Sequence, residues 1–258
     1  IKTAELSYPK QLQINKNQNF RESIFDQIDR EDLLVCTPYE SFDPILRFFN
    51  EAAIDPTVDE IYTTLYRIAG DSHIAQALAT AAKNGKRVNV FVELKARFDE
   101  ANNIHWARLM KEQGVKITYS IPNLKVHAKI ALVKRKEGRE SALLGTGNLN
   151  EKTAKVYTDY FLMTSNKLLT NELDMLFEFL PARRKPHHPN ELSFNHLLIA
   201  QFNLKHTFLS LIDKTIQAAK DGDSATIKIK LNNLEEESLI NKLYEASRAG
   251  VKLQLLVR

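Results

Sequence analysis

The stretch of sequence that decides the fold is EIYTTLYRIAGDSHIAQALATAAKNGKRVNVFVEL, residues 60–94. It opens with a strand pattern at 60–66, continues through an amphipathic helix that ends at Gly85, and returns to alternating valines at 87–94. A strand, a helix and a second strand joined by short turns form a βαβ unit with parallel strands. The sequence therefore predicts an α/β protein built on a mainly parallel sheet covered by helices.

Neighbouring patterns extend this sheet. A helix pattern over 101–113 leads into a strand at 115–120, and only a short loop separates that strand from VHAKIALVK, residues 126–134. Because so short a loop cannot make a parallel crossover, the strand over 126–134 is predicted to run antiparallel to its predecessor. The remaining elements of this domain are expected to be strands at 32–39, 141–145 and 156–163 and helices at 41–53 and 170–180.

The chain is predicted to contain a lead-in segment at 1–30, a first domain at 31–186 and a second domain at 187–258. The second domain repeats the strand–helix–glycine–strand order, and a shift of 165 residues places Gly85 on Gly250 and Val92 on Val257. Such matches arise by chance between any two βαβ units as readily as by duplication. Since two parallel strands make a poor sheet alone, the second domain is expected to be incomplete.

Composition excludes several classes of protein. Hydrophobic residues make up 43% and charged residues 26% of the 258 residues, which is the balance of a globular chain. No apolar run approaches the roughly 18 residues of a membrane span, and the first residues lack the layout of a signal peptide. Cys36 is the only cysteine, which excludes an intrachain disulfide or a cysteine metal cluster and favours a reducing, cytoplasmic location. The net charge of +4 suits anionic partners without identifying one.

Three basic side chains are predicted to meet at one edge of the sheet. Arg67 follows the strand at 60–66, Arg97 lies just past the strand at 87–94, and His127 opens the antiparallel strand at 126–134. Ligands of open α/β sheets bind at the carboxyl ends of the strands, which is this edge. Alternation along the strand also places Lys129 on the same face as His127.

This combination suits phosphoryl transfer. Histidine is a nucleophile that can be neutral near pH 7, and arginine holds phosphate oxygens with two parallel hydrogen bonds. Each residue also has an ordinary structural interpretation. A single histidine on a strand is more often structural, Arg97 could pair with Asp99 or Glu100, and Lys129 could extend from a surface strand into solvent. The residue types alone leave both interpretations open.

Longer motifs carry a resemblance. The pair His127 and Lys129, followed by Gly145-Thr146-Gly147-Asn148, resembles the H-x-K…G-S-x-N half-motif of the phospholipase D superfamily, although Lys134 stands where that motif has an aspartate. The departure argues against an ordinary phosphodiesterase. The segments LYRIAGDS (65–72), VELKARFDEANNIHWA (92–107), LKVHAK (124–129) and GTGNLNEKTAKVYTDY (145–160) look like those of the histidine-dependent bacterial polyphosphate kinases.

The resemblance implies a phospholipase D-like mixed sheet flanked by helices, duplicated, with the second copy truncated. It implies reversible transfer of the γ-phosphate of ATP to the end of a polyphosphate chain through a phosphohistidine at His127. Lys129 and Asn148 would assist catalysis, Arg67 and Arg97 would position the phosphate and its Mg²⁺, and Tyr157 and Arg258 would contact ATP.

The resemblance also implies ATP, ADP and inorganic polyphosphate as partners, no nucleic acid, and a homo-oligomer at full length. The location would be cytoplasmic, with membrane association as a variant. Because the family's second essential histidine and its amino-terminal domains lie outside these 258 residues, the chain alone is expected to be impaired. Two other functions stay open: a phospholipase D-like phosphodiesterase acting through the same residues, and a non-catalytic module that binds polyanions.

Overall fold

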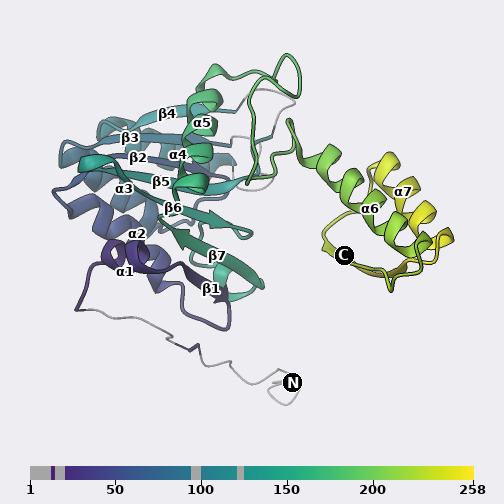
Figure 1. Ribbon diagram of the computed structural model, residues 1–258. Helices are drawn as coiled ribbons and strands as arrows, with labels where there is room; N and C mark the ends of the chain where they lie inside the picture. The colour runs from purple at the N-terminus through teal and green to yellow at the C-terminus, as the bar shows by residue number, and fades with distance from the viewer. Residues whose placement is uncertain (1–12, 15–20, 94–99, 121–124) are drawn as a thin grey trace, which may run out of the picture. The chain divides into compact units, whose positions relative to one another are not determined.

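The computed structural model describes residues 13–14, 21–93, 100–120 and 125–258, which fall into two compact units, Ile1–Arg184 and Lys185–Arg258 (Figure 1). Each unit is considered by itself. Within these described ranges, no helix combines the length and the apolar character needed to cross a membrane.

The first unit is built on one sheet whose strands lie in the order β1-β7-β6-β5-β2-β3-β4. The strands are β1 (Leu33–Thr37), β2 (Val58–Leu65), β3 (Arg87–Val92), β4 (Lys116–Tyr119), β5 (Lys129–Arg135), β6 (Arg139–Gly145) and β7 (Asp159–Thr164). β2, β3 and β4 pair in parallel, whereas the pairs β2–β5, β5–β6, β6–β7 and β1–β7 are antiparallel. Two of the six strand pairs are therefore parallel and four are antiparallel.

Helices cover both faces of this sheet. α1 (Ile24–Arg30), α2 (Asp43–Ile54), α3 (His73–Lys83) and α4 (Glu100–Glu112) follow one another in contact, and α5 (Lys167–Phe179) packs on β5 and β6 (Figure 1). The alternation of β5 assigns the faces: Lys134 forms an ion pair with Asp174 of α5, while the next residue, Arg135, pairs with Asp29 of α1. The predicted mixed sheet flanked by helices is confirmed.

Two expected strands begin later than their apolar patterns suggested. The strand expected at 126–134 starts at Lys129, and it pairs with β2 rather than with the preceding strand β4. The strand expected at 156–163 starts at Asp159, because the backbone N–H groups of Val156 and Tyr157 both donate to the Thr153 carbonyl in a tight turn. In both places hydrogen bonds other than the regular strand pairing hold residues whose side chains alone suit a strand: side-chain contacts from Glu93 and Thr64 at 126–128, and a local turn at 156–157.

The second unit contains α6 (Leu204–Lys220), β8 (Thr226–Leu231), α7 (Glu237–Arg248) and β9 (Lys252–Val257). β8 and β9 pair in parallel, as the repeated sequence pattern predicts, and α6 is a helix that the pattern did not predict. The small core of this unit consists of Ile212, Ile216, Leu243, Ala246 and Val251. That the unit is an incomplete copy of the first stays a prediction.

Candidate active site

The carboxyl ends of β2, β3 and β4 meet at one edge of the first unit, and Ser120, Val126 and Ala128 are held at this edge. At the end of β4, the N–H of Ser120 donates to the Val92 carbonyl over 3.1 Å. Further along, the N–H of Val126 donates to the carboxylate of Glu93 over 3.1 Å. The carbonyl of Ala128 then accepts a 2.6 Å hydrogen bond from the hydroxyl of Thr64 on β2. These contacts place His127 at the end of β2, where β5 begins.

Three of the predicted site residues meet around the ring of Tyr66, which directly follows β2. The His127 imidazole packs edge-on against this ring, with 4.6 Å between ring centroids and 78° between planes. The Lys129 ammonium lies 5.0 Å and the Arg67 guanidinium carbon 5.9 Å from the same centroid. Lys129 also donates a hydrogen bond from Nζ to the backbone carbonyl of His127. One aromatic ring thus gathers the imidazole and two cations.

The surroundings lower the pKa of both the imidazole and the ammonium. The pKa of His127 is lowered by partial burial and then by the charges of Lys129, Lys125 and Arg67, with Glu93 acting weakly the other way. Burial lowers the pKa of Lys129 to about 8; Asp159 opposes this shift and Arg67 adds to it. At pH 7 the imidazole is therefore neutral, with a lone pair available, while Lys129 carries its charge.

The glycine-rich loop after β6 packs against Asp159 at the start of β7. The Thr146 hydroxyl donates to the Asp159 carboxylate over 2.9 Å and accepts from the N–H of Tyr160 over 3.0 Å. A side chain at Gly147 would collide with the same carboxylate. Asn148 follows, and its amide oxygen is buried with no hydrogen-bond donor within the described part of the chain. A buried acceptor without a donor is costly in a folded protein and is common where a ligand binds.

The backbone around Arg67 is held by two asparagine side chains. Asn103 of α4 is fully buried; its amide nitrogen donates to the Tyr66 carbonyl over 2.8 Å, and its oxygen accepts from the N–H of Ile68 over 3.1 Å. Asn150 donates to the carbonyl of Arg67 itself over 3.2 Å. The Arg67 side chain therefore extends from a backbone segment that these hydrogen bonds hold in place.

Three further predicted site residues, Tyr157, Arg258 and Arg97, lie in different parts of the sequence. Tyr157 lies in the loop before β7 with 45% of its surface exposed. Arg258 follows β9 in the second unit, where its N–H donates to the Leu231 carbonyl. Arg97 lies outside the described residues. Lys134, which replaces the aspartate of the phospholipase D motif, pairs with Asp174 and Glu140.

Sequence reasoning missed four residues of the site: Tyr66, Glu93, Asn103 and Asp159. Glu93 and Asp159 carried a signal, because each is a carboxylate at the end of a mostly apolar strand pattern. Tyr66 and Asn103 carried none, since an aromatic residue at a strand end and an asparagine in a helix are unremarkable until folding brings them to Arg67.

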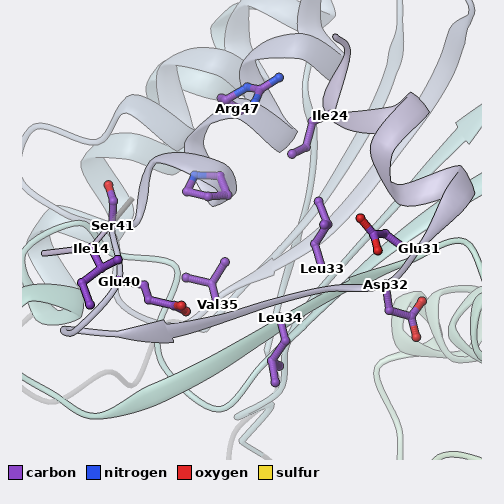
Figure 2. Close-up of a pocket in the computed structure, with 11 residues that line it drawn as sticks. Ile14, Ile24, Glu31, Asp32, Leu33, Leu34, Val35, Glu40, Ser41 and Arg47 are labelled. Carbon is purple, nitrogen blue, oxygen red and sulfur yellow. The ribbon is translucent and has the colours of Figure 1, made fainter. Parts of the chain in front are cut away.

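A pocket of about 310 Å³ lies elsewhere in the first unit, between α1, β1 and α2. Figure 2 shows Leu33 and Val35 pointing from β1 to the side of Arg47, and Leu34 pointing the other way. Two of its polar side chains have partners: Glu40 accepts from the N–H of Cys36 over 2.6 Å, and Arg47 donates to Glu51 over 2.7 Å. None of the predicted site residues lines it.

In the described part of the chain, no cluster of three or more histidine, cysteine, aspartate or glutamate side chains could hold a metal ion. A mixed sheet with helices on both faces is the arrangement that the phospholipase D-like resemblance implied. The solved structure of phosphatidylserine synthase from Haemophilus influenzae shares the fold alone, with a TM-score of 0.59 and 10% identity over 88% of this chain and 61% of that one.

Residues 23–186 match the family described as polyphosphate kinase C-terminal domain 1, and residues 197–258 match polyphosphate kinase C-terminal domain 2. The chain belongs to the polyphosphate kinase family, as the resemblance implied.

Relatives agree with this assignment. The chain is 45% identical over 237 residues to the polyphosphate kinase of Klebsiella pneumoniae and 44% identical over 241 residues to that of Bacillus cereus, covering 91% and 92% of this chain. It spans 34% of the length of each of these relatives. The crystal structure of polyphosphate kinase from Porphyromonas gingivalis matches with a TM-score of 0.83 and 41% identity, over 97% of this chain and 41% of that one.

Proposed function

We propose that this chain is the part of a polyphosphate kinase that carries the phosphoryl-accepting histidine, His127. The observation that supports this most is the packing of the imidazole against Tyr66 beside Lys129 and Arg67, whose charges favour the neutral ring. A neutral imidazole among fixed cations is the nucleophile that phosphoryl transfer requires.

The proposed reaction has two steps. A ring nitrogen of His127 bonds to the γ-phosphorus of ATP, the bond from that phosphorus to the β,γ-bridging oxygen breaks, and ADP leaves. The terminal oxygen of a polyphosphate chain then bonds to the same phosphorus, the nitrogen–phosphorus bond breaks, and the chain is one phosphate longer. Both steps are reversible because each replaces one phosphoanhydride or phosphoramidate bond by another.

The neighbouring side chains hold the charge that moves during these steps. Lys129 and Arg67, with Arg97, would offset the charge of the transferring oxygens. Asn148 would serve as a nearby hydrogen-bonding group, and Mg²⁺ would enter bound to the phosphates of ATP. Tyr157 and Arg258 are proposed to contact the nucleotide, on the strength of the family resemblance.

The remaining partners belong to the same proposal. The substrates are ATP, ADP and inorganic polyphosphate, and nucleic acid is not a partner. The full-length protein is proposed to be a cytoplasmic homo-oligomer.

Labelling with γ-labelled ATP and Mg²⁺ tests the proposal. The chain should acquire an acid-labile, base-stable phosphate on His127, more slowly than a relative about three times as long, because His127 alone supplies the nucleophile but not the whole site. His127→Asn should lose the label. His105→Asn, which alters a histidine on α4 that contacts Trp106, should keep it.

A label that persists in His127→Asn, or its absence from the wild-type chain under conditions that label a full-length relative, would contradict the proposal. A phosphodiesterase would instead cleave diester substrates and take no label from ATP. A module that only binds polyanions would bind polyphosphate equally well before and after the His127→Asn change.

A further inference from the structure

A buried carboxylate stands directly beneath the segment that carries His127. Glu93, the residue after β3, is 1% exposed. One of its carboxylate oxygens accepts from the Ser120 hydroxyl over 2.8 Å, and the other accepts from the N–H of Val126 over 3.1 Å. The carboxylate therefore connects the residue that follows β4 to the residue that immediately precedes His127.

The backbone of Glu93 is fixed to the frame that also carries Arg67. Its N–H donates to the Leu65 carbonyl over 3.0 Å, and its carbonyl accepts from the buried Asn103 amide over 2.9 Å. That same amide nitrogen donates to the Tyr66 carbonyl over 2.8 Å. Through Glu93, the backbone next to His127 is thus tied to the strand end from which Tyr66 and Arg67 project.

Burying a carboxylate at this position is energetically unfavourable compared with burying an apolar side chain. Removing an ionised group from water is unfavourable unless hydrogen bonds and nearby charges offset the loss of hydration. A leucine of similar size would fill the same space without that cost, next to a strand whose residues Val88, Val90 and Val92 are all buried. What a leucine could not do is accept a hydrogen bond from the backbone N–H of Val126.

We propose that Glu93 is a positioning residue for His127. The Glu93 carboxylate fixes the backbone at Val126, so that the imidazole stays against Tyr66 and beside Arg67. The proposal rests on the proposed role of His127 as nucleophile. The Glu93 carboxylate accepts hydrogen bonds from Ser120 and from the backbone of Val126, so the proposed action on His127 runs through the backbone. Displacing a reacting group by about 1 Å can cost on the order of a hundredfold in rate.

Three substitutions at Glu93 separate the effects of side-chain length, charge and volume. Glu93→Gln keeps the length: its oxygen can accept from Val126, and its amide can donate to the Ser120 hydroxyl, which then acts as acceptor. Glu93→Asp keeps the charge but is one methylene shorter, too short to span both partners. Glu93→Leu keeps the volume and loses both hydrogen bonds. Glu112→Gln, at an exposed carboxylate on α4 that pairs with Arg108, is the matched control.

Two readouts follow these variants in the 258-residue chain: the rate of His127 phosphorylation from ATP, and the hydrogen-exchange protection of the Val126 amide measured by NMR without substrate. Glu93→Leu and Glu93→Asp should slow phosphorylation by about a hundredfold and lose the Val126 protection. Glu93→Gln should stay within about threefold of the wild-type rate and keep the protection, as two neutral hydrogen bonds replace two charge-assisted ones. Glu112→Gln should change neither readout.

Wild-type phosphorylation in Glu93→Asp or Glu93→Leu would overturn the proposal while leaving His127 as the nucleophile. Equal losses in Glu93→Gln and Glu93→Leu would also overturn it, because charge rather than the backbone contact would then be responsible. If His127 accepts no phosphate in the wild-type chain, the proposed function fails. Val126 protection that is lost in Glu93→Asp and kept in Glu93→Gln would still show that Glu93 holds this segment.

Discussion

His127 and Lys129 are subject to the same two physical effects. Lys129 is buried, whereas the His127 side chain is only partly desolvated and stays exposed at the surface. Each lies beside other cations, so the pKa of each side chain is lower than its ordinary value. For the imidazole this favours the neutral, nucleophilic form. For the ammonium it narrows the pH range in which the charge persists, to below about 8. The proposed phosphoryl transfer needs His127 neutral and Lys129 charged, and these two conditions define the pH range in which the reaction is fast.

The rate of His127 phosphorylation should therefore follow a bell-shaped curve against pH. The midpoint of the acid limb should lie at a lower pH than the ordinary pKa of histidine, since the pKa of His127 is lowered. The alkaline limb should fall near pH 8, where Lys129 loses its proton. Lys129→Met should remove the alkaline limb and reduce the rate at pH 7 by about a hundredfold, the usual effect of losing one fixed charge-stabilising group. An unchanged alkaline limb in Lys129→Met would contradict this assignment.

Stability supplies the control for that variant. The folded chain binds the Lys129 proton with a pKa of about 8, whereas the unfolded chain holds it with the ordinary lysine pKa, so below pH 8 the buried ammonium destabilises the fold. Between pH 8 and that ordinary value only the unfolded state keeps the proton, and the free energy of unfolding should rise. Lys129→Met should lack this rise and be at least as stable at pH 7. Its loss of rate would then have a chemical cause.

Sequence reasoning reached the charged members of this site because their types and spacing carry chemical meaning. His127, Lys129 and Arg67 could be placed at one strand edge from the order of strands and helices alone. The ring that gathers them could not, because Tyr66 acquires its role only from the pairing of β5 with β2. The same is true of Glu93, whose partners Ser120 and Val126 lie about thirty residues further along the chain.

At the scale of elements, the loop between β6 and β7 needs a glycine at position 147, because there is no room for a side chain there. Gly147 faces the Asp159 carboxylate so closely that a Cβ would overlap it. Asp159 is also the carboxylate that opposes the lowered pKa of Lys129. A displacement of this loop would thus change the electrostatic surroundings of Lys129.

Gly147→Ala should lower the free energy of unfolding by about 1–3 kcal/mol, the usual cost of overpacking, and slow His127 phosphorylation. Chemical denaturation and ATP labelling measure the two effects. Gly70→Ala is the matched control, because a Cβ there would meet only the end of the Lys152 side chain at 3.9 Å. Equal stability of the two variants would show that Asp159 can move aside without cost.

The elements that could be predicted from sequence are those marked by a local pattern of residues. The helices α3 and α4, which end just before Gly85 and Gly114, and the strands β2, β3 and β4 follow from periodicity and capping. The partner of β5 could not be predicted, because strand order across a sheet depends on contacts between distant segments. A short connection excludes a parallel neighbour but does not say which strand the chain will join.

At the scale of the whole molecule, the two units differ in how much apolar surface they bury. The first has a core that runs from α1 to β7 and includes fully buried phenylalanines such as Phe48 and Phe161. The second has a core of five buried residues and a sheet of only two strands. Three apolar residues of β9 stay exposed in this unit: Leu255 at 41%, Leu256 at 64% and Val257 at 47%. A two-stranded parallel pair with so little cover is marginal in water.

Hydrogen exchange should therefore separate the units under native conditions. Backbone amides of β8 and β9 should exchange on the order of a hundredfold faster than those of β5 and β6, because opening the small unit exposes little additional apolar surface. Mass spectrometry of peptides from the exchanged chain measures this, with α6 and α7 expected to follow β8 and β9 as one cooperative group. Equal protection of all four strands would show that the 258 residues unfold as a single unit, and the small core would then need stabilisation from outside its own residues.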